Sequence, residues 1–267
     1  MEENLNLAPV QSLWIGDKLS KVEQLCIKSF LDAGHEFHLY TYENVANVPE
    51  GTNVMNARHI IEEDKIFRFE DGWGKGSVSG FADLFRLLLL KKNGGWWVDM
   101  DIICLKPFVI DQELVICTSY ESNYGELANN CVIKAPQESD FINYCINELA
   151  KSDIKKLPFG AAGPFLFQRV VKEMKLEAFL VPYYYFNPIA WKFVGDLVLG
   201  KMSIINKFKE VLRPVFKPKT LSGRVIDRNS FSIHLWNEVW SASGFNKNEI
   251  YKPASLFEKI KKRHQIK

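Results

Sequence analysis

One short segment constrains this 267-residue chain more than any other, the run Trp96-Trp-Val-Asp-Met-Asp101. It follows Gly94-Gly95, a pair that allows a chain reversal because glycine adopts positive φ at little cost. Its first three residues are large and apolar, which predicts a buried strand. The segment therefore predicts a strand that lies in a core and ends in two exposed carboxylates.

Short apolar segments alternate with helical patterns over most of the chain. The predicted strands span residues 12–16, 36–41, 96–104, 114–119, 131–135, 179–185 and 231–236. The predicted helices span residues 18–33, 79–92, 139–151 and 164–175, with a short one at 54–63. Residues 201–230, rich in Lys, Arg and Pro, show the least regular pattern. This alternation is typical of an α/β domain with a mixed, mostly parallel sheet flanked by helices.

Composition excludes several classes of protein. No apolar run reaches the roughly 18–20 residues of a membrane span, and the N-terminus lacks the basic and apolar regions of a secretory signal. Aromatic residues make up 13% of the chain, which argues against disorder. No C-x-x-C spacing relates the cysteines, which favours free thiols in a reducing, cytoplasmic compartment. They are Cys26, Cys104, Cys117, Cys131 and Cys145.

The two acids at the predicted strand end suggest a metal site. Asp99 and Asp101 lie two residues apart, so on an extended strand they point to the same side. A hard divalent cation such as Mg²⁺ or Mn²⁺ would relieve their repulsion and bridge to phosphate oxygens. The alternative is a solvated strand end or a pair of caps, because D-x-D often occurs by chance.

The preceding helix carries one pair of opposite charges. Asp83 and Arg86 are three residues apart and share a face of that helix. They either pair with each other or reach into the site, where Asp83 would accept sugar hydroxyls and Arg86 would donate to sugar or phosphate. Spacing alone leaves both interpretations open.

The ordered set of these features resembles a known family. It runs Ser79-Gly-Phe-Ala-Asp-Leu-Phe-Arg86, a leucine-rich helix, Gly94-Gly95, the two aspartates and Lys106-Pro107. This set is similar to the sugar-binding D-x-D region of family 32-type glycosyltransferases, which include bacterial polysaccharide glycosyltransferases and yeast mannosyltransferases. The family is related to the catalytic domains of large clostridial glucosylating toxins. The resemblance implies a GT-A fold, with a Rossmann-like nucleotide half abutting an acceptor half in one continuous sheet.

Flanking segments extend the resemblance. Leu13-Trp-Ile-Gly16 resembles the family's first-strand W-I-G, whose Trp stacks on the nucleotide base, a contact worth roughly 1–3 kcal/mol. Ser232-Ile-His-Leu-Trp-Asn237 resembles its H-x-W-N segment. Gly160-Ala-Ala-Gly-Pro164 resembles a T-G-P helix start with alanine in place of threonine, and Asn129-Asn130 resembles an acceptor-side pair. An ordinary core Trp14 and a structural His234 are the alternatives.

The resemblance thus implies a complete set of site residues. Catalytic roles fall to Arg86, Asp99 and Asp101, and metal ligation to Asp99, Asp101 and His234. The implied donor-binding residues are Trp14, Ile15, Asp83, Arg86, Asp99, Met100, Trp236 and Asn237.

The implied function is a metal-dependent, retaining transfer of sugar from a nucleotide sugar, with UDP-sugars expected first. The expected acceptor is a glycan or lipid-linked glycan in cell-surface polysaccharide synthesis; the alternative is an effector that modifies a protein. Two further classes stay in view, a phosphatase of the haloacid dehalogenase type, which also uses D-x-D after a strand, and a carbohydrate-binding module. Activity on simple phosphate esters would identify the phosphatase.

Charge is unevenly distributed along the chain. The total is 34 basic against 32 acidic residues, yet residues 201–267 hold 15 basic and 5 acidic ones. The basic residues expected to matter most are Lys207, Lys209, Arg213, Lys217, Lys219 and those at 259–263. Such clusters attract anionic membrane surfaces or anionic acceptors, and no nucleic-acid motif accompanies them. We expect one domain over 1–267, peripheral on the inner membrane face, with a nucleotide half (1–110), an acceptor half (111–240) and a basic C-terminal segment (241–267).

Overall fold

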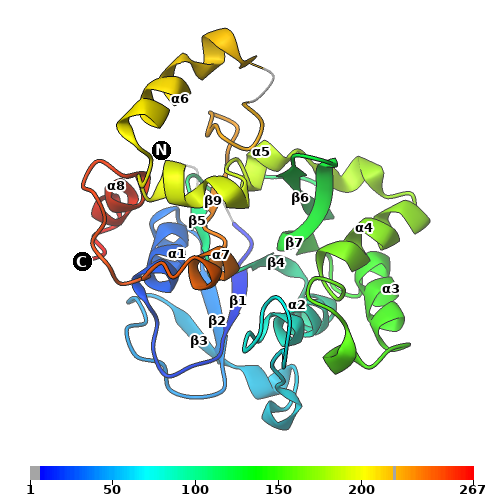
Figure 1. Cartoon of the computed structure of the whole chain (residues 1–267). Helices are drawn as coiled ribbons and strands as arrows, with labels where there is room; N and C mark the ends of the chain where they lie inside the picture. The colour runs from blue at the N-terminus through cyan, green and yellow to red at the C-terminus, as the bar shows by residue number, and fades with distance from the viewer. Residues whose placement is uncertain (1–6, 219–220) are drawn as a thin grey trace, which may run out of the picture.

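The computed structural model describes residues 7–218 and 221–267, so the expected charge of Lys219 lies outside the described residues. A seven-stranded sheet runs through its centre in the order β3-β2-β1-β4-β7-β6-β8 (Figure 1). The strands are β1 (Val10–Trp14), β2 (Phe37–Thr41), β3 (Asn53–Asn56), β4 (Gly95–Val98), β6 (Val115–Glu121), β7 (Gly125–Ala135) and β8 (Leu180–Val181). Strand β7 runs antiparallel to β4 and β6, and the other neighbours run parallel. The expected α/β class with a mixed, mostly parallel sheet is confirmed.

Helices cover both faces of this sheet because successive strand residues point to opposite sides. Trp96 packs in one apolar core with α1 (Lys21–Asp32), α5 (Tyr183–Phe186), α7 (Asn237–Ala242) and α8 (Leu256–Arg263). Its neighbour Trp97 packs in the other core with α2 (Ser79–Asn93), α3 (Asp140–Leu149) and α4 (Pro164–Glu173). The two tryptophans therefore anchor β4 between both layers.

Local signals explain where the helices near the site begin and end. Helix α1 begins at a capping box, in which the Ser20 hydroxyl accepts from the Val22 N–H and the Glu23 carboxylate accepts from the Ser20 N–H. Helix α2 ends at Gly94, whose φ of 64° suits glycine, and a side chain there would meet the Gln137 nitrogen at 2.6 Å. The Gly-Gly reversal thus returns the chain directly into β4.

Three sequence expectations are wrong in detail. Residues 54–63 are no helix: β3 pairs in parallel with β2 there, and a short 3₁₀ turn follows at Ala57–His59. The strand expected over 96–104 is two strands, because β5 (Ile102–Cys104) leaves the sheet to pair with β9 (Ser232–His234). The strand expected over 179–185 is only β8, since the tyrosines after Pro182 form α5.

The basic C-terminal quarter also differs from expectation. Its least regular stretch contains a helix, α6 (Ile204–Phe216). Ser203 caps the N-terminus of this helix, since its hydroxyl accepts from the Asn206 N–H. Part of its positive charge is neutralised by ion pairs within the protein. Lys261 is buried and pairs with Glu258, and Lys247 pairs with buried Glu23. Within the described ranges, no helix combines the length and apolarity needed to cross a bilayer.

Candidate active site

A cleft of about 970 Å³ opens at the carboxyl ends of β1 and β4. This is where ligands bind in open α/β sheets. The structure brings every sequence-predicted site residue to its wall, although the strands and helices that carry them are distant in sequence. They are Trp14, Ile15, Asp83, Arg86, Asp99, Met100, Asp101, His234, Trp236 and Asn237.

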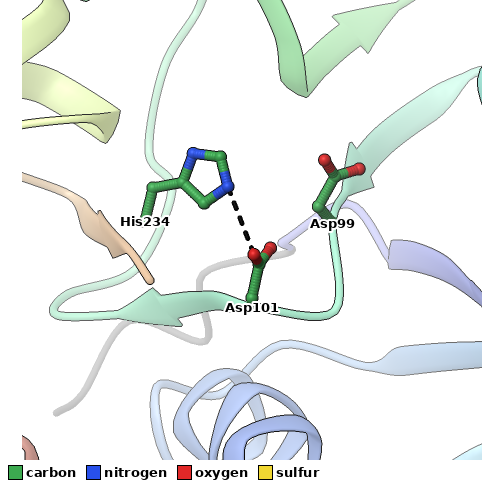
Figure 2. A group of neighbouring side chains, drawn as sticks. All are labelled: Asp99, Asp101 and His234. Atoms are coloured by element: carbon green, nitrogen blue, oxygen red, sulfur yellow. Dashed lines mark ion pairs between the residues drawn. The ribbon is translucent and has the colours of Figure 1, made fainter. Parts of the chain in front are cut away.

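The two aspartates meet in a turn, and the expectation of an extended strand is wrong. Residues 99–101 connect β4 to β5, and the Ile102 N–H donates to the Asp99 carbonyl at 3.0 Å. Figure 2 shows both carboxylates and the His234 ring pointing toward one space. One ligand atom from each residue lies within 4.8 Å of the others. The turn is possible because β5 changes partner from the sheet to β9.

Asn187 fixes which nitrogen of His234 faces this space. The Asn187 Nδ2 donates to the Thr118 carbonyl at 2.8 Å, so its Oδ1 accepts from His234 Nδ1 at 3.0 Å. His234 Nε2 then lies 3.3 Å from Asp101 Oδ2. A lone pair there would face a carboxylate, so Nε2 needs a proton or a cation shared with Asp101.

The charges at Asp101 and His234 support each other. Burial acts against the charged form of Asp101, but His234 and the Asn237 N–H outweigh it and hold the pKa of this carboxyl below its usual range. Burial likewise acts to lower the pKa of His234, yet Asp101 raises the pKa of the imidazole well above its usual value. The Asn237 N–H donates to Asp101 Oδ2 at 2.5 Å.

Trp236 holds this corner in place. Its φ of 58° is left-handed, which is strained for a bulky residue and turns the chain so that the Asn237 N–H faces Asp101. Its ring stacks on His234 with 3.9 Å between centroids, and its Nε1 donates to the Ile189 carbonyl at 3.0 Å.

Asp83 and Arg86 both pair with each other and reach the cleft. Arg86 Nη2 lies 3.0 Å from Asp83 Oδ1, and Nη1 donates to Asp99 Oδ1 at 2.8 Å. The guanidinium also lies over the Trp97 ring, 4.9 Å from its centroid. Burial raises the pKa of Asp83 to about 6, although Arg86 and Asn130 favour its charged form. Burial also raises the pKa of Asp99, with Arg86 opposing the shift.

Glycine is required where α4 approaches this pair. A side chain at Gly163 would meet Asn130 Nδ2 at 2.7 Å and Asp83 Oδ2 at 2.8 Å. The Asn130 amide donates to Asp83 Oδ1 at 2.7 Å. Gly163 therefore lets Asn130 lie against Asp83, a structural reason for the G-P start of α4.

Sequence reasoning missed two residues that organise the site. Asn187 is fully buried, and 47 residues separate it from His234, so no spacing links them. Glu238, on α7, accepts from the Ser77 hydroxyl at 2.6 Å and ties the loop before α2 to the cleft wall. Neither contact has a local pattern; the Asn-Pro pair after three tyrosines is the only signal near Asn187.

The residues present fit a hard divalent cation. Among the described residues, three buried polar side-chain atoms have no hydrogen-bond partner, and all three belong to residues of the cleft wall: Trp14 Nε1, Ser79 Oγ and Asn237 Oδ1. Asn237 Oδ1 belongs to the residue bound to Asp101, and amide and carboxylate oxygens are the donors that Mg²⁺ and Mn²⁺ prefer. The Trp14 N–H is likewise buried without a partner, in a residue of the same cleft wall.

Known proteins share features with this chain. Residues 21–123 match the family model "Glycosyltransferase sugar-binding region containing DXD motif". No curated protein matches the sequence significantly.

Several solved glycosyltransferase structures align with the chain at low sequence identity. PaToxG glycosyltransferase is 15% identical with a TM-score of 0.43, over 97% of this chain and 84% of that one. GlyE of Streptococcus pneumoniae TIGR4 is 11% identical with a TM-score of 0.49, over 98% of this chain and 61% of GlyE. The UDP-bound glycosyltransferase domain of the YGT toxin is 9% identical with a TM-score of 0.44, over 78% and 88%.

The family match covers the part of the chain that contains the D-x-D turn and the Asp83–Arg86 pair. Both features line one cleft with His234 and Asn237. Residues 21–123 therefore contain a glycosyltransferase sugar-binding region with a DXD motif, and the chain is a glycosyltransferase.

Proposed function

We propose that this glycosyltransferase moves a sugar from a nucleotide-sugar donor to a glycan or lipid-linked glycan acceptor, with UDP-sugars as the first donors to test. The observation that carries the proposal is the joint placement of Asp83, Arg86, Asp99, Asp101 and His234 on one cleft. A sugar and a diphosphate need different partners, and these groups would supply them side by side, with Trp14 on the same cleft for the base. We assign residues 1–110 to the nucleotide-sugar half, 111–240 to the acceptor half and closure of the cleft, and 241–267 to a basic C-terminal segment.

The donor would be held by groups at opposite ends of the site. Asp83 Oδ2 accepts sugar hydroxyls while Oδ1 stays with Asn130 and Arg86. Arg86, fixed by Asp83 and Asp99, directs its positive charge toward sugar or phosphate. Trp14, at the end of β1, offers its ring to the base and its unpartnered N–H to the ligand.

Asp99, Asp101, His234 and Asn237 would hold a Mn²⁺ or Mg²⁺ ion. Such an ion, when bound, neutralises charge on the leaving diphosphate. His234 needs no rotation to take part, because Asn187 already aims its Nε2 at the Asp101 carboxylate. Trp236 covers the His234 ring and limits solvent access.

We further propose retention of anomeric configuration without a dedicated protein base. Each described carboxylate on the cleft wall already has partners: Asp83 has Arg86 and Asn130, Asp99 has Arg86, Asp101 has Asn237, and Glu238 has Ser77. The acceptor hydroxyl would then transfer its proton to the leaving phosphate oxygen as the new glycosidic bond forms on the same face.

The test is direct. The full chain is incubated with Mn²⁺ and UDP-glucose, UDP-galactose, UDP-N-acetylglucosamine or GDP-mannose, and nucleotide release and thermal stabilisation are recorded. We expect one UDP-sugar to be cleaved only with metal, and NMR of the product to show the donor's anomeric configuration. No metal-dependent cleavage or stabilisation with any nucleotide sugar would overturn the donor assignment, and a sugar covalently attached to a carboxylate would overturn the direct route. Glycan and lipid-linked glycan acceptors are screened in the same way. Transfer to a protein acceptor instead would overturn the acceptor assignment.

A further inference from the structure

Helix α6 presents its apolar side to solvent. Figure 1 shows it at the rim of the molecule, at the top of the view. None of its residues is buried. Six large apolar side chains are 66–86% exposed: Ile204, Ile205, Phe208, Val211, Val215 and Phe216. A surface helix normally turns such a side inward, so this orientation requires a physical explanation.

The apolar residues form one continuous stripe. Ile204, Phe208, Val211 and Val215 recur at spacings of four and three, so they share a face. With 3.6 residues per turn, the six side chains span about 140° of the helix circumference along a length of about 20 Å. Patches of this kind on a surface are typical of binding sites for a protein or a membrane.

Polar contacts hold the opposite side of α6 to the protein. Glu210 accepts from Arg224, which lies outside the helix, at 2.7 Å, and from Arg213 of the same helix at 2.8 Å. Arg224 in turn stacks on Phe193, 3.6 Å from the ring centroid, and its backbone bridges to Ile189. The Glu210–Arg224 ion pair therefore ties this side of α6 to the rest of the protein, with the apolar stripe facing outward.

Lysines border the stripe on both sides. Lys207 and Lys209 lie just beyond its two edges, and both are exposed with no ion pair to any residue in the described ranges. Lysine side chains at such borders extend to lipid headgroups while apolar neighbours insert below them. A protein partner needs no such symmetric positive border, whereas an anionic lipid surface matches it.

We propose that α6 binds the surface of an anionic membrane, with its apolar stripe in the interface and Lys207 and Lys209 on the headgroups. The binding stands on α6 alone and not on the proposed function. One consequence does rest on that function: Ile189 pairs with Arg224 and accepts from Trp236, so a bound α6 would keep the cleft near lipid-linked acceptors.

The test uses the full chain and vesicles of phosphatidylcholine with or without 30% phosphatidylglycerol. We expect sedimentation with the anionic vesicles to exceed that with neutral vesicles by at least tenfold, since each lysine near such a surface contributes about fivefold. The double variants Phe208→Asp/Val211→Asp and Lys207→Glu/Lys209→Glu should each lose at least tenfold. Val54→Asp, at an apolar position on β3 that is 55% exposed, is the control and should bind as wild type.

A second readout reports insertion. A polarity-sensitive dye on Val211→Cys should shift to the blue on anionic vesicles, while the same dye on Val54→Cys should not; the five native cysteines are buried. Equal binding to both vesicles, or unchanged binding by either double variant, would overturn the proposal. A stable dimer that is dissociated by Phe208→Asp/Val211→Asp would also overturn the proposal, because it would show that α6 binds a second copy of the chain. Nucleotide-sugar cleavage should be unchanged in all variants. A loss of lipid binding with normal cleavage would show that the membrane contact and the chemistry are independent of each other.

Discussion

Asn187 Oδ1 accepts a hydrogen bond from His234 Nδ1 at 3.0 Å, although 47 residues separate the two in sequence. This contact decides that Nε2 of His234 faces Asp101. Partners behind a metal-binding histidine fix its tautomer and its ring orientation. The relationship therefore gives Asn187 a positioning role in the metal site that we propose.

Replacing Asn187 with leucine should weaken Mn²⁺ binding by roughly 10–100-fold, the range seen when such partners are lost. The expected cause is a His234 ring without a fixed tautomer. Titration with Mn²⁺, followed by electron paramagnetic resonance of the free ion, measures the affinity. Asn147→Leu, an exposed asparagine on α3, is the control, and thermal melting checks folding. If Asn187→Leu binds Mn²⁺ as wild type while His234→Ala does not, the positioning role is wrong.

Asp101→Asn should reduce sugar transfer by about 100-fold or more while leaving the fold intact. The change removes a negative charge from the metal position and replaces an oxygen that accepts from the Asn237 N–H at 2.5 Å. Initial rates at saturating Mn²⁺ provide the measurement. Asp111→Asn, an exposed aspartate outside the cleft, should have wild-type rates. Full activity in Asp101→Asn would remove this residue from the catalytic set.

The parts of the fold that follow local rules could be predicted from the sequence. Helix α2 begins at Ser79 and ends beside Gly94, as its apolar spacing and the Gly-Gly pair predicted. The site residues that the resemblance implied all lie on the cleft wall, because it placed them as an ordered set, while their roles stay a prediction. The α/β class follows from the alternation of strands and helices.

Long-range contacts explain what could not be predicted. The turn at Asp99–Asp101 exists because β5 pairs with β9, some 130 residues away. Asn187 lies near His234 only after that pairing forms, so its role has no spacing signal. Helix α6 is a different case: its apolar residues have helical spacing, but Pro214 and the surrounding basic residues obscured the pattern.

The stability of the protein should depend on the ionisation of Asp83. Burial raises the pKa of this carboxyl to about 6 in the folded state, whereas an unfolded aspartate titrates near about 3.9. The folded state therefore binds more protons between these values, and the free energy of unfolding falls as pH rises from about 4 to 6. A two-unit shift corresponds to at most about 3 kcal/mol.

Asp83→Asn should remove this penalty. Relative to wild type, the variant should gain about 1–3 kcal/mol of unfolding free energy between pH 4 and pH 7, while losing sugar transfer. Urea unfolding of both proteins without metal, at several pH values, measures the difference. Asp99 titrates in both proteins, so its contribution largely cancels. A stability difference that stays constant over this pH range would contradict the raised pKa.

Gly163→Ala should lower sugar transfer by roughly 10–100-fold, since displacement of a positioning group by about 1 Å has effects of this size. The added methyl group would meet Asn130 Nδ2 at 2.7 Å and Asp83 Oδ2 at 2.8 Å, so Asp83 must move. Steady-state kinetics with the preferred donor give the change. Ala161→Ser, two residues away, adds similar bulk and should be nearly silent. Equal rates in both variants would show that Asp83 needs no fixed position.

Trp14 provides the sharpest test of how the base is held. Stacking on its ring is worth about 1–3 kcal/mol, so Trp14→Ala should weaken UDP binding by about 5–150-fold. Trp14→Phe keeps an aromatic face but lacks the buried, unpartnered N–H, so it should lose less than Trp14→Ala and still bind more weakly than wild type. Isothermal titration with UDP and Mn²⁺ measures all three proteins, and thermal melting checks the packing of Trp14 against the core. Equal affinities in the three would leave Trp14 as a core residue only, whereas equal losses in both variants would assign its role to the N–H rather than to the ring.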